Sequence, residues 1–301
     1  MQDILDQIHN EVKQLKNKGV PAQYIPALAE QEVEDFGMSV LTIDQQLYTV
    51  GSSDKQFSIQ SVSKLFSLLY ALSKDPSLLG KRVGVEPSGQ AFNSLVQLEH
   101  ERGIPRNPFI NAGALVVADH LFSILPTPKR SYLELMRSLS QNDDLNYDKV
   151  VAASERDTGY RNAALANFLK SFDNLQNDPE HILDLYYHQC ALAVSCTDLV
   201  RAGFLLANQG VTLQGTPVLT SSLTKRLNAL MLTCGMYDAV GNFAFEVGVP
   251  AKSGVGGGIL AVIPGKMVIA TYGPGLDQMH NSVSGVFALK RFTDLTECSI
   301  F

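Results

Sequence analysis

Residues 61–64 read Ser61-Val62-Ser63-Lys64, an S-x-x-K sequence at the start of a predicted helix. Residues three apart lie on one face of a helix, so the Ser61 hydroxyl and the Lys64 amine are expected to be neighbours. Unpaired backbone N–H groups in the first turn of a helix favour negative charge on a nearby oxygen. The stretch therefore predicts a serine nucleophile with a lysine base. Ser63 is the poorer nucleophile candidate, because it points elsewhere on the helix.

A second short sequence near the other end of the chain supports the catalytic interpretation of the first. Such support is needed because S-x-x-K alone occurs by chance in many proteins. Lys252-Ser253-Gly254 is followed by Val255, three glycines and the apolar run 259–263. In penicillin-binding proteins and serine β-lactamases, a K-[ST]-G strand faces the S-x-x-K helix and contributes a backbone N–H to the oxyanion hole. A glycine-rich phosphate loop is the alternative, but such loops lead into a helix, whereas a β-rich segment follows here.

Longer strings, in order along roughly residues 20 to 290, resemble the serine-dependent glutaminases of the β-lactamase-like fold. One departure is Ala191, where that family usually has a serine after the cysteine. The matching strings are Tyr24-Ile25-Pro26, Ile59-Gln60-Ser61-Val62-Ser63-Lys64, Val85-Glu86-Pro87-Ser88-Gly89, Ala91-Phe92-Asn93-Ser94, Pro105-Arg106-Asn107-Pro108, Ile110-Asn111-Ala112-Gly113-Ala114, Ser154-Glu155, Arg161-Asn162, Tyr186, Gln189-Cys190 and Pro250-Ala251-Lys252-Ser253-Gly254-Val255-Gly256-Gly257-Gly258.

The hydrophobic pattern predicts an α+β fold, similar to the β-lactamase and transpeptidase architecture. A first helix ends near Gly19, and runs 38–43 and 46–50 form a hairpin. Helices are predicted at 110–124, 131–140, 160–172, 180–190, 197–208, 220–233 and 281–293, and strands at 243–249, 259–263 and 267–272. We expect one catalytic unit over 1–301, with an antiparallel sheet flanked by terminal helices. About 1–70 and 236–301 form its sheet lobe, and about 71–235 its helical lobe.

Composition excludes several classes of function. The net charge of −6 and the lack of a dense Lys/Arg stripe argue against a nucleic-acid partner. No apolar run is long enough to cross a membrane, and the amphipathic start is unlike a signal peptide, so we expect a cytoplasmic protein. The cysteines at 190, 196, 234 and 298 form no C-x-x-C pair and are expected to be reduced. His188, Cys190 and Cys196 fit no familiar zinc spacing, so neither a metal nor an organic cofactor is predicted.

The resemblance implies a glutaminase, which hydrolyses L-glutamine to L-glutamate and ammonia. Ser61 would attack the amide to form an acyl-enzyme, and Lys64 must be neutral to act as its general base. Burial and a nearby cation would both lower the pKa of Lys64, and Lys252 is the expected source of that repulsion. Backbone N–H groups of Ser61 and Val255 would form the oxyanion hole. Either Tyr186 or Tyr237 would relay protons, and the sequence does not decide between them.

A free amino acid also requires groups that bind its ammonium and its carboxylate. The resemblance assigns Glu155 to the ammonium and asparagine and tyrosine side chains to the carboxylate. Taken singly, these residues have ordinary structural interpretations, such as helix caps or solvated ion pairs. The family also commonly forms homodimers or homotetramers, so a homo-oligomer is expected. The full substrate-binding set implied by the resemblance is Tyr24, Ser61, Asn111, Glu155, Asn162, Tyr186, Tyr237 and Val255.

Three other functions stay open at this stage. A β-lactamase or penicillin-binding hydrolase could use Ser61, Lys64 and Lys252 on a cyclic amide, although the cytoplasmic character and the Glu155 string count against it. Another amidase of the same fold could act on asparagine. A non-catalytic amino-acid sensor could keep the pocket, but it would not need both the serine and the lysine.

Overall fold

A five-stranded antiparallel sheet joins the two ends of the chain. The computed structural model describes residues 1–89 and 91–301. The strand order is β2-β1-β7-β6-β5, so the N-terminal hairpin pairs through β1 with the C-terminal strand β7. This confirms the predicted α+β class with an antiparallel sheet. The strands are β1 (Gly37–Thr42), β2 (Leu47–Gly51), β5 (Ala251–Ser253), β6 (Gly258–Ile263) and β7 (Met267–Tyr272).

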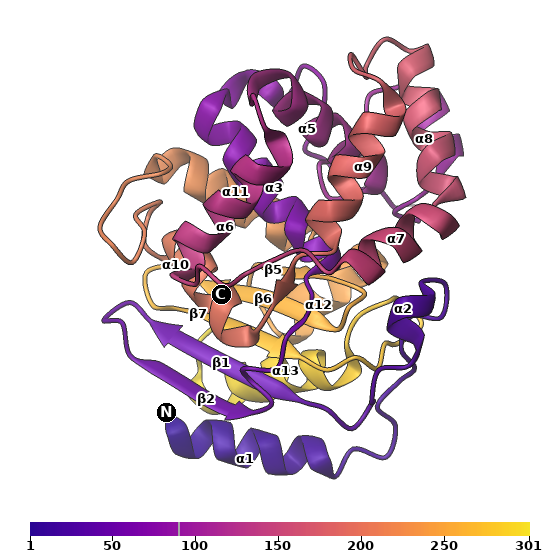
Figure 1. Ribbon diagram of the computed structural model, residues 1–301. Helices are drawn as coiled ribbons and strands as arrows, with labels where there is room; N and C mark the ends of the chain where they lie inside the picture. Colours follow the sequence, from indigo (N-terminus) through magenta and orange to yellow (C-terminus); the bar gives the residue numbers. More distant parts are fainter. Residues whose placement is uncertain (90) are drawn as a thin grey trace.

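Helices cover both faces of this sheet, which explains why every residue of β6 and β7 is buried. In β6, Ile259 and Ala261 belong to the core formed with α1 (Gln2–Lys13) and α13 (Val283–Thr296). Leu260 and Val262 face the opposite core, which includes α10 (Cys196–Ala207). Burying each such aliphatic side chain contributes about 1.5–3 kcal/mol. Figure 1 shows α1 along the outer side of the sheet and most other helices on the far side.

Most of the remaining helices pack together beyond the α10 face of the sheet (Figure 1), whereas Phe243 of α12 belongs to the core with α1 and α13. The central one, α3, contacts α5, and α5 in turn contacts α8 and α9. Two short strands, β3 (Phe57–Ser58) and β4 (Ala193–Val194), form a separate pair. The helices are α2 (Pro26–Ala29), α3 (Ser63–Lys74), α4 (Leu95–His100), α5 (Asn111–Ile124), α6 (Pro128–Ser140), α7 (Lys149–Thr158), α8 (Tyr160–Ser171), α9 (Pro179–Cys190), α11 (Ser221–Cys234) and α12 (Val240–Glu246), with 3-10 turns at Gln60–Val62, Pro76–Leu78 and Tyr237–Ala239.

Most predicted elements are confirmed within a few residues, but the strand predicted at 243–249 is wrong. That stretch belongs mainly to α12, and the true strand β5 begins at Ala251. Phe243, Phe245 and Val247 alternate with other residues as they would in a strand. In the structure Phe243 and Val247 are buried, four residues apart on one helical face, while Phe245 is 86% exposed. The buried residues of this stretch therefore recur with the spacing of a helix and not with the alternation of a strand. The division into two lobes stays a prediction.

The sequence reading also missed α7, which carries Glu155. Asp148 caps this helix by accepting hydrogen bonds from the N–H groups of Val150 and Val151. Val151, Ala152 and Glu155 are buried along one side of it. The capping aspartate followed by this spacing is the signal that could have revealed the helix.

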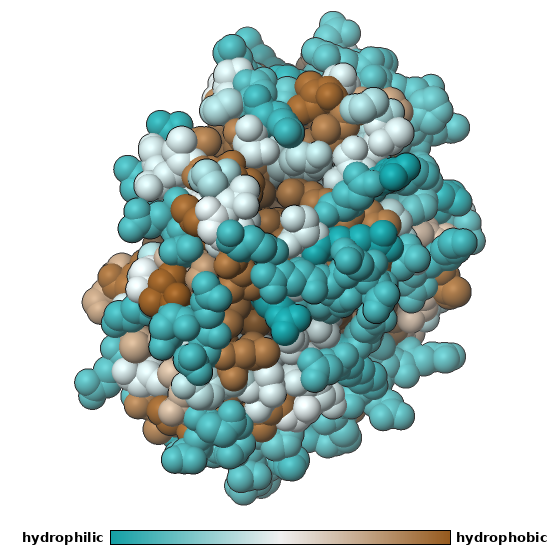
Figure 2. Space-filling model, turned by 60° about the vertical axis from the view of Figure 1, so that its left-hand side comes forward, coloured by the Kyte–Doolittle hydropathy of each residue, from teal (hydrophilic) through white to brown (hydrophobic). Residues whose placement is uncertain are grey.

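The surface is mostly hydrophilic on the face drawn in Figure 2, with hydrophobic residues gathered toward its middle. Across the part of the chain that the structure describes, every helix is too short or too polar to cross a membrane.

Candidate active site

Ser61 lies in the 3-10 turn Gln60–Val62, directly before α3 begins at Ser63. This corrects the expectation that it lies inside the first turn of the α-helix. Gln60, the residue before it, has a φ of +47°, in the left-handed region that costs a side-chain-bearing residue free energy. The Ser61 side chain borders a pocket, while Lys64 is buried beneath it. The local backbone thus presents the hydroxyl at the pocket and keeps the amine inside.

The K-S-G strand β5 leads into the loop that packs against the Ser61 turn, and glycine makes the approach possible. A Cβ on Gly254 would lie 2.8 Å from the carbonyl oxygen of Ile59 and 3.2 Å from the amide nitrogen of Ser61. Two backbone atoms would therefore have to move to accept a side chain. Val255, the next residue, lines the same pocket as Ser61. The structure brings together the two residues predicted to form the oxyanion hole.

Lys64 is surrounded by hydrogen-bond acceptors rather than by a carboxylate partner. Its Nζ donates to the carbonyl oxygen of Phe109 at 3.2 Å and to Oδ1 of Asn111 at 2.6 Å. Burial disfavours the charged amine and lowers the pKa of Lys64 to about 8, against smaller opposing effects of Cys190 and Glu155. A useful fraction of the amine is therefore neutral at mildly alkaline pH, as a general base requires.

Lys252 is buried close to Tyr237. Its Nζ donates to the carbonyl oxygens of Gly235 at 3.2 Å and Ser253 at 2.5 Å, and lies 4.8 Å from the centroid of the Tyr237 ring. Burial, followed by repulsion from Lys64, lowers the pKa of Lys252 well below its usual range. The expected repulsion between the two amines is present, and burial is the largest cause of the lowered pKa of each of them.

The two candidate relay tyrosines occupy different positions. Tyr237 has a φ of +51° and stands at the start of a 3-10 turn, with the Ser61 hydroxyl and the Val255 backbone close to its own hydroxyl. That hydroxyl makes no well-formed hydrogen bond, and burial raises its pKa. The Tyr186 hydroxyl instead lies 3.5 Å from Oδ1 of Asn111. Tyr237 is thus beside the nucleophile, whereas Tyr186 is beside the asparagine that binds Lys64.

A pocket between the Ser61 turn and helices α7 and α8 contains most of the predicted substrate-binding residues. Tyr237 borders an adjoining cavity instead. Sequence reasoning did not single out Gln60, Phe92, Asn93 or Arg161, although all four lie within the strings quoted above. The lining residues are Tyr24, Ile25, Gln60, Ser61, Phe92, Asn93, Asn111, Glu155, Thr158, Gly159, Arg161, Asn162, Tyr186 and Val255.

Glu155 is a buried carboxyl in this pocket with an unsatisfied oxygen. Its side chain is only 7% exposed, and Oε1 has no hydrogen-bond partner. Burial raises the pKa of Glu155 to about 7, while the Gln60 amide and the Lys64 charge favour the carboxylate. A buried, underbonded carboxyl is costly for folding unless something else binds it. Its position fits a cationic group of a ligand.

Asn111 connects this carboxyl end of the pocket to the lysine. Its Oδ1 accepts from Lys64, and its Nδ2 donates to Oδ1 of Asn162 at 2.8 Å. Both asparagines therefore have side-chain partners inside the site and are not used as simple helix caps. Tyr24 covers the other side of the pocket from the N-terminal segment and is half exposed.

Comparisons with known proteins identify the family to which the chain belongs. The family model named glutaminase matches residues 19–301. The chain is 50% identical over 298 residues to the glutaminase of Streptomyces coelicolor, covering 99% of this chain and 97% of that protein. It is 51% identical over 300 residues to the glutaminase of Shewanella loihica, covering 99% of each. This chain belongs to the glutaminase family.

Solved structures agree with this glutaminase in fold. A structure described as a probable glutaminase superposes with a TM-score of 0.94 at 32% identity, covering 100% of this chain and 97% of that one. A probable glutaminase from Bacillus subtilis complexed with 6-diazo-5-oxo-L-norleucine superposes with a TM-score of 0.85 at 34% identity, covering 100% and 95%. The neighbours support the β-lactamase-like fold expected from the sequence.

The histidine and cysteines considered for a metal site have other surroundings in this glutaminase. His188 pairs with Asp184 on its own helix, and the Ser63 hydroxyl lies 3.9 Å from the sulfur of Cys190. Within residues 1–89 and 91–301, His, Cys, Asp and Glu side chains form no group of three or more that could hold a metal ion.

Proposed function

We propose that this glutaminase hydrolyses L-glutamine to L-glutamate and ammonia through a Ser61 acyl-enzyme, with Lys64 as the general base. The observation that carries the proposal is the placement of Ser61 on a strained turn, between a buried lysine with a pKa of about 8 and the close-packed Gly254-Val255 backbone. A neutral amine can take the hydroxyl proton, and a fixed backbone can stabilise the oxyanion.

The first step forms a bond between the Ser61 oxygen and the amide carbon of glutamine. The serine proton moves to Lys64, and the carbonyl oxygen becomes an oxyanion. Backbone N–H groups of Ser61 and Val255 donate to that oxyanion in our proposal. Fixed donors of this kind stabilise charge that develops only in the transition state, so they accelerate the reaction rather than tighten substrate binding.

Ammonia then leaves and water completes the reaction. The leaving nitrogen needs a proton, and we assign its transfer to Tyr237, because its unbonded hydroxyl is adjacent to Ser61. Tyr186 is assigned a positioning role through Asn111. Lys64 passes the proton it took from Ser61 to the Tyr237 oxygen. Water then attacks the γ-glutamyl ester and gives one proton to Lys64, which passes it to the Ser61 oxygen as the ester C–O bond breaks, and glutamate is released.

Recognition of the free amino acid is assigned to the α7 and α8 side of the pocket. Glu155 accepts hydrogen bonds from the α-ammonium of glutamine, which supplies the missing partner of its buried oxygen. The positive ammonium also favours the ionised form of a carboxyl whose pKa in the empty pocket is about 7. Asn111, Asn162 and Tyr24 supply polar atoms for the α-carboxylate. A cytoplasmic location, a homo-oligomer and chemistry without a cofactor stay predictions from the sequence.

The test is ammonia and glutamate production from glutamine by the native protein and by Ser61→Ala at matched folded concentration. Loss of the nucleophile should reduce kcat by about 10⁴-fold or more. Activity that survives would overturn the covalent mechanism. Glutamine-dependent thermal stabilisation without ammonia release would indicate a sensor, and parallel assays with asparagine and nitrocefin would detect the other two alternatives.

A further inference from the structure

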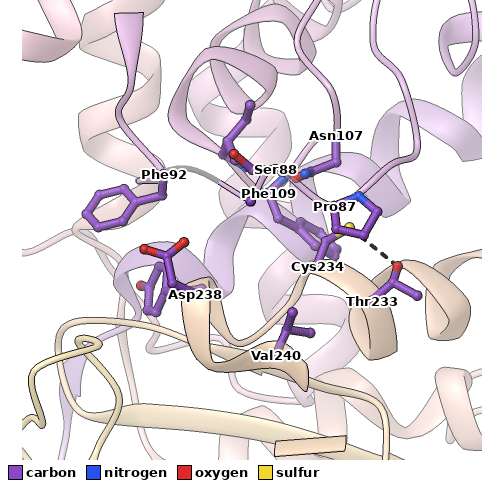
Figure 3. A pocket seen from close by; sticks show the side chains of 12 residues that line it. Pro87, Ser88, Phe92, Asn107, Phe109, Thr233, Cys234, Asp238 and Val240 are labelled. Carbon is purple, nitrogen blue, oxygen red and sulfur yellow. Dashed lines mark hydrogen bonds between the residues drawn. The ribbon is translucent and has the colours of Figure 1, made fainter. Parts of the chain in front are cut away.

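A second cavity adjoins the substrate pocket, and one side chain separates them. Phe92 lines both cavities, whereas Glu155 and Asn162 line only the substrate pocket. Figure 3 shows the Phe92 ring at one end of the second cavity, with Asp238 and Val240 below it and Phe109 and Cys234 across from it. Because Phe92 is the residue common to both sets of lining residues, we call it the partition between the two spaces.

Aromatic contacts and a backbone hydrogen bond hold Phe92 in place. The Phe92 ring lies 5.2 Å from the Tyr237 ring and 5.6 Å from the His280 ring, between centroids, and is almost perpendicular to the latter. These are favourable aromatic geometries. The backbone oxygen of Phe92 accepts a hydrogen bond of 2.8 Å from the amide of Asn111. The Phe92 backbone thus contacts Asn111, which lines the substrate pocket, and the Phe92 ring contacts Tyr237, which is beside the nucleophile.

Several hydrogen bonds hold the loop that carries His280 in place. Oδ1 of Asp277 accepts from the amides of Met279 at 2.8 Å and Asn281 at 2.9 Å. Nδ2 of Asn281 donates to the carbonyl oxygen of Met236 at 3.3 Å, directly before Tyr237. His280 has a φ of +65° in this loop, a conformation that glycine adopts without strain. The imidazole ring is therefore held in place against Phe92 by its backbone.

The second cavity is partly lined by Tyr237, the residue to which we assign proton transfer to the leaving nitrogen. Tyr237, whose hydroxyl is next to Ser61, forms part of its wall. Phe109, whose carbonyl oxygen accepts from Lys64, forms another part. In the proposed reaction the amide nitrogen of glutamine is oriented toward Tyr237, its proton donor. A substituent on that nitrogen would then extend toward the second cavity, at the boundary that Phe92 lines.

We infer that Phe92 is a specificity-determining residue that restricts the reaction to primary amides by closing the second cavity to N-alkyl groups. The inference rests on the proposed function. Hydrolysis of an N-alkyl glutamine would need no new reagent. The Ser61 oxygen bonds to the carbonyl carbon, the C–N bond breaks, and the alkylamine leaves with a proton that water later restores to the site. Only the space for the alkyl group is lacking.

The experiment compares L-glutamine with γ-N-propyl-L-glutamine as substrates for native protein, Phe92→Leu and Phe92→Ala. The measured quantity is the ratio of kcat/KM for the two substrates, determined from glutamate release. We expect Phe92→Ala to shift the ratio toward the propyl amide by about tenfold or more, with Phe92→Leu between it and native. Val85→Ala is the matched control. Val85 is 47% exposed in the same segment and lines neither cavity, so its ratio should equal the native ratio.

His280→Gly tests the same partition without touching Phe92. Glycine suits the φ at this position, so folding should be preserved, while the ring loses one of its two aromatic supports. We expect a smaller shift in the same direction. An unchanged substrate ratio in folded Phe92→Ala and His280→Gly would overturn the inference. Failure of the native protein to hydrolyse glutamine would instead overturn the proposed function.

Discussion

The reacting end and the recognition end of the substrate pocket are built in different ways. At the reacting end, backbone packing brings Ser61 and Val255 together. Gly254 permits this close approach because it has no side chain. At the recognition end, Glu155 and Asn162 are side chains of two successive helices that form one wall. The first end depends on backbone geometry at two short motifs. The second depends on how several helices pack.

Burial also has opposite chemical consequences at the two ends. It lowers the pKa of Lys64 to about 8 and raises that of Glu155 to about 7, since a low dielectric disfavours charge in both cases. A general base benefits when its neutral form is favoured. A carboxylate that binds an ammonium needs the opposite state, so its ligand must help to restore its charge. One physical effect therefore prepares the base and leaves the recognition group dependent on substrate.

The largest expected effect breaks the reacting end alone. Lys64→Met should lower kcat by about 10³-fold, because the proton acceptor is lost while a chain of similar length fills the space. Lys74→Met is a matched control, since Lys74 is exposed near the end of the same helix. Steady-state ammonia release measures the loss. A Lys64→Met protein that is folded and retains native kcat would contradict the assignment of the base.

The pH profile should reveal both ends together. As pH rises, Glu155 becomes charged near 7 and Lys64 becomes neutral near 8, so both changes increase activity. Between pH 8.5 and 6, kcat/KM should therefore fall by about 10²-fold or more. Initial rates at low glutamine concentration, with protein folding checked at each pH, measure this. A profile that is flat over this range would exclude the proposed protonation states.

Gly254→Ala should damage the oxyanion hole while leaving every functional side chain in place. The added Cβ would be too close to the Ile59 carbonyl oxygen, and relief requires the Val255 backbone to move away from Ser61. We expect kcat to fall by about 10²-fold, the typical effect of losing one oxyanion donor. Gly241→Ala, where an added Cβ meets nothing within 4 Å, provides the control. Equal activity of the two variants would indicate that this close approach has no catalytic importance.

The smallest expected effect concerns recognition. Glu155→Gln preserves size but removes the charge, so the preference for glutamine over glutaramate, which lacks the α-ammonium, should decrease about 30-fold. Asp157→Asn serves as the control, because Asp157 is exposed on the same helix. The comparison uses kcat/KM for both substrates and the thermal midpoint of each variant. If stability falls and the preference does not, Glu155 has a structural role instead.

Local sequence was sufficient to predict the proposed reacting end. The S-x-x-K spacing predicted Ser61 and Lys64 as the nucleophile and base, and the K-S-G motif predicted the segment that packs against them. The largely apolar runs of β6 and β7 predicted buried strands, and both are buried because both faces of the sheet are covered. Family resemblance then named Glu155 and Asn162, whose individual positions carry no distinctive signal. Alternation over 243–249 was misleading because only packing decides which phenylalanines are buried.

The sequence by itself determined which chemistry we propose: which hydroxyl, which amine and which glycine-lined strand belong together, since each is encoded within a few residues. Tertiary structure alone decided that burial lowers the pKa of Lys64, that Tyr237 rather than Tyr186 is beside Ser61, and that Phe92 meets His280. Those contacts join residues far apart in the chain. Their distances and dielectric surroundings exist only once the helices and the sheet have packed.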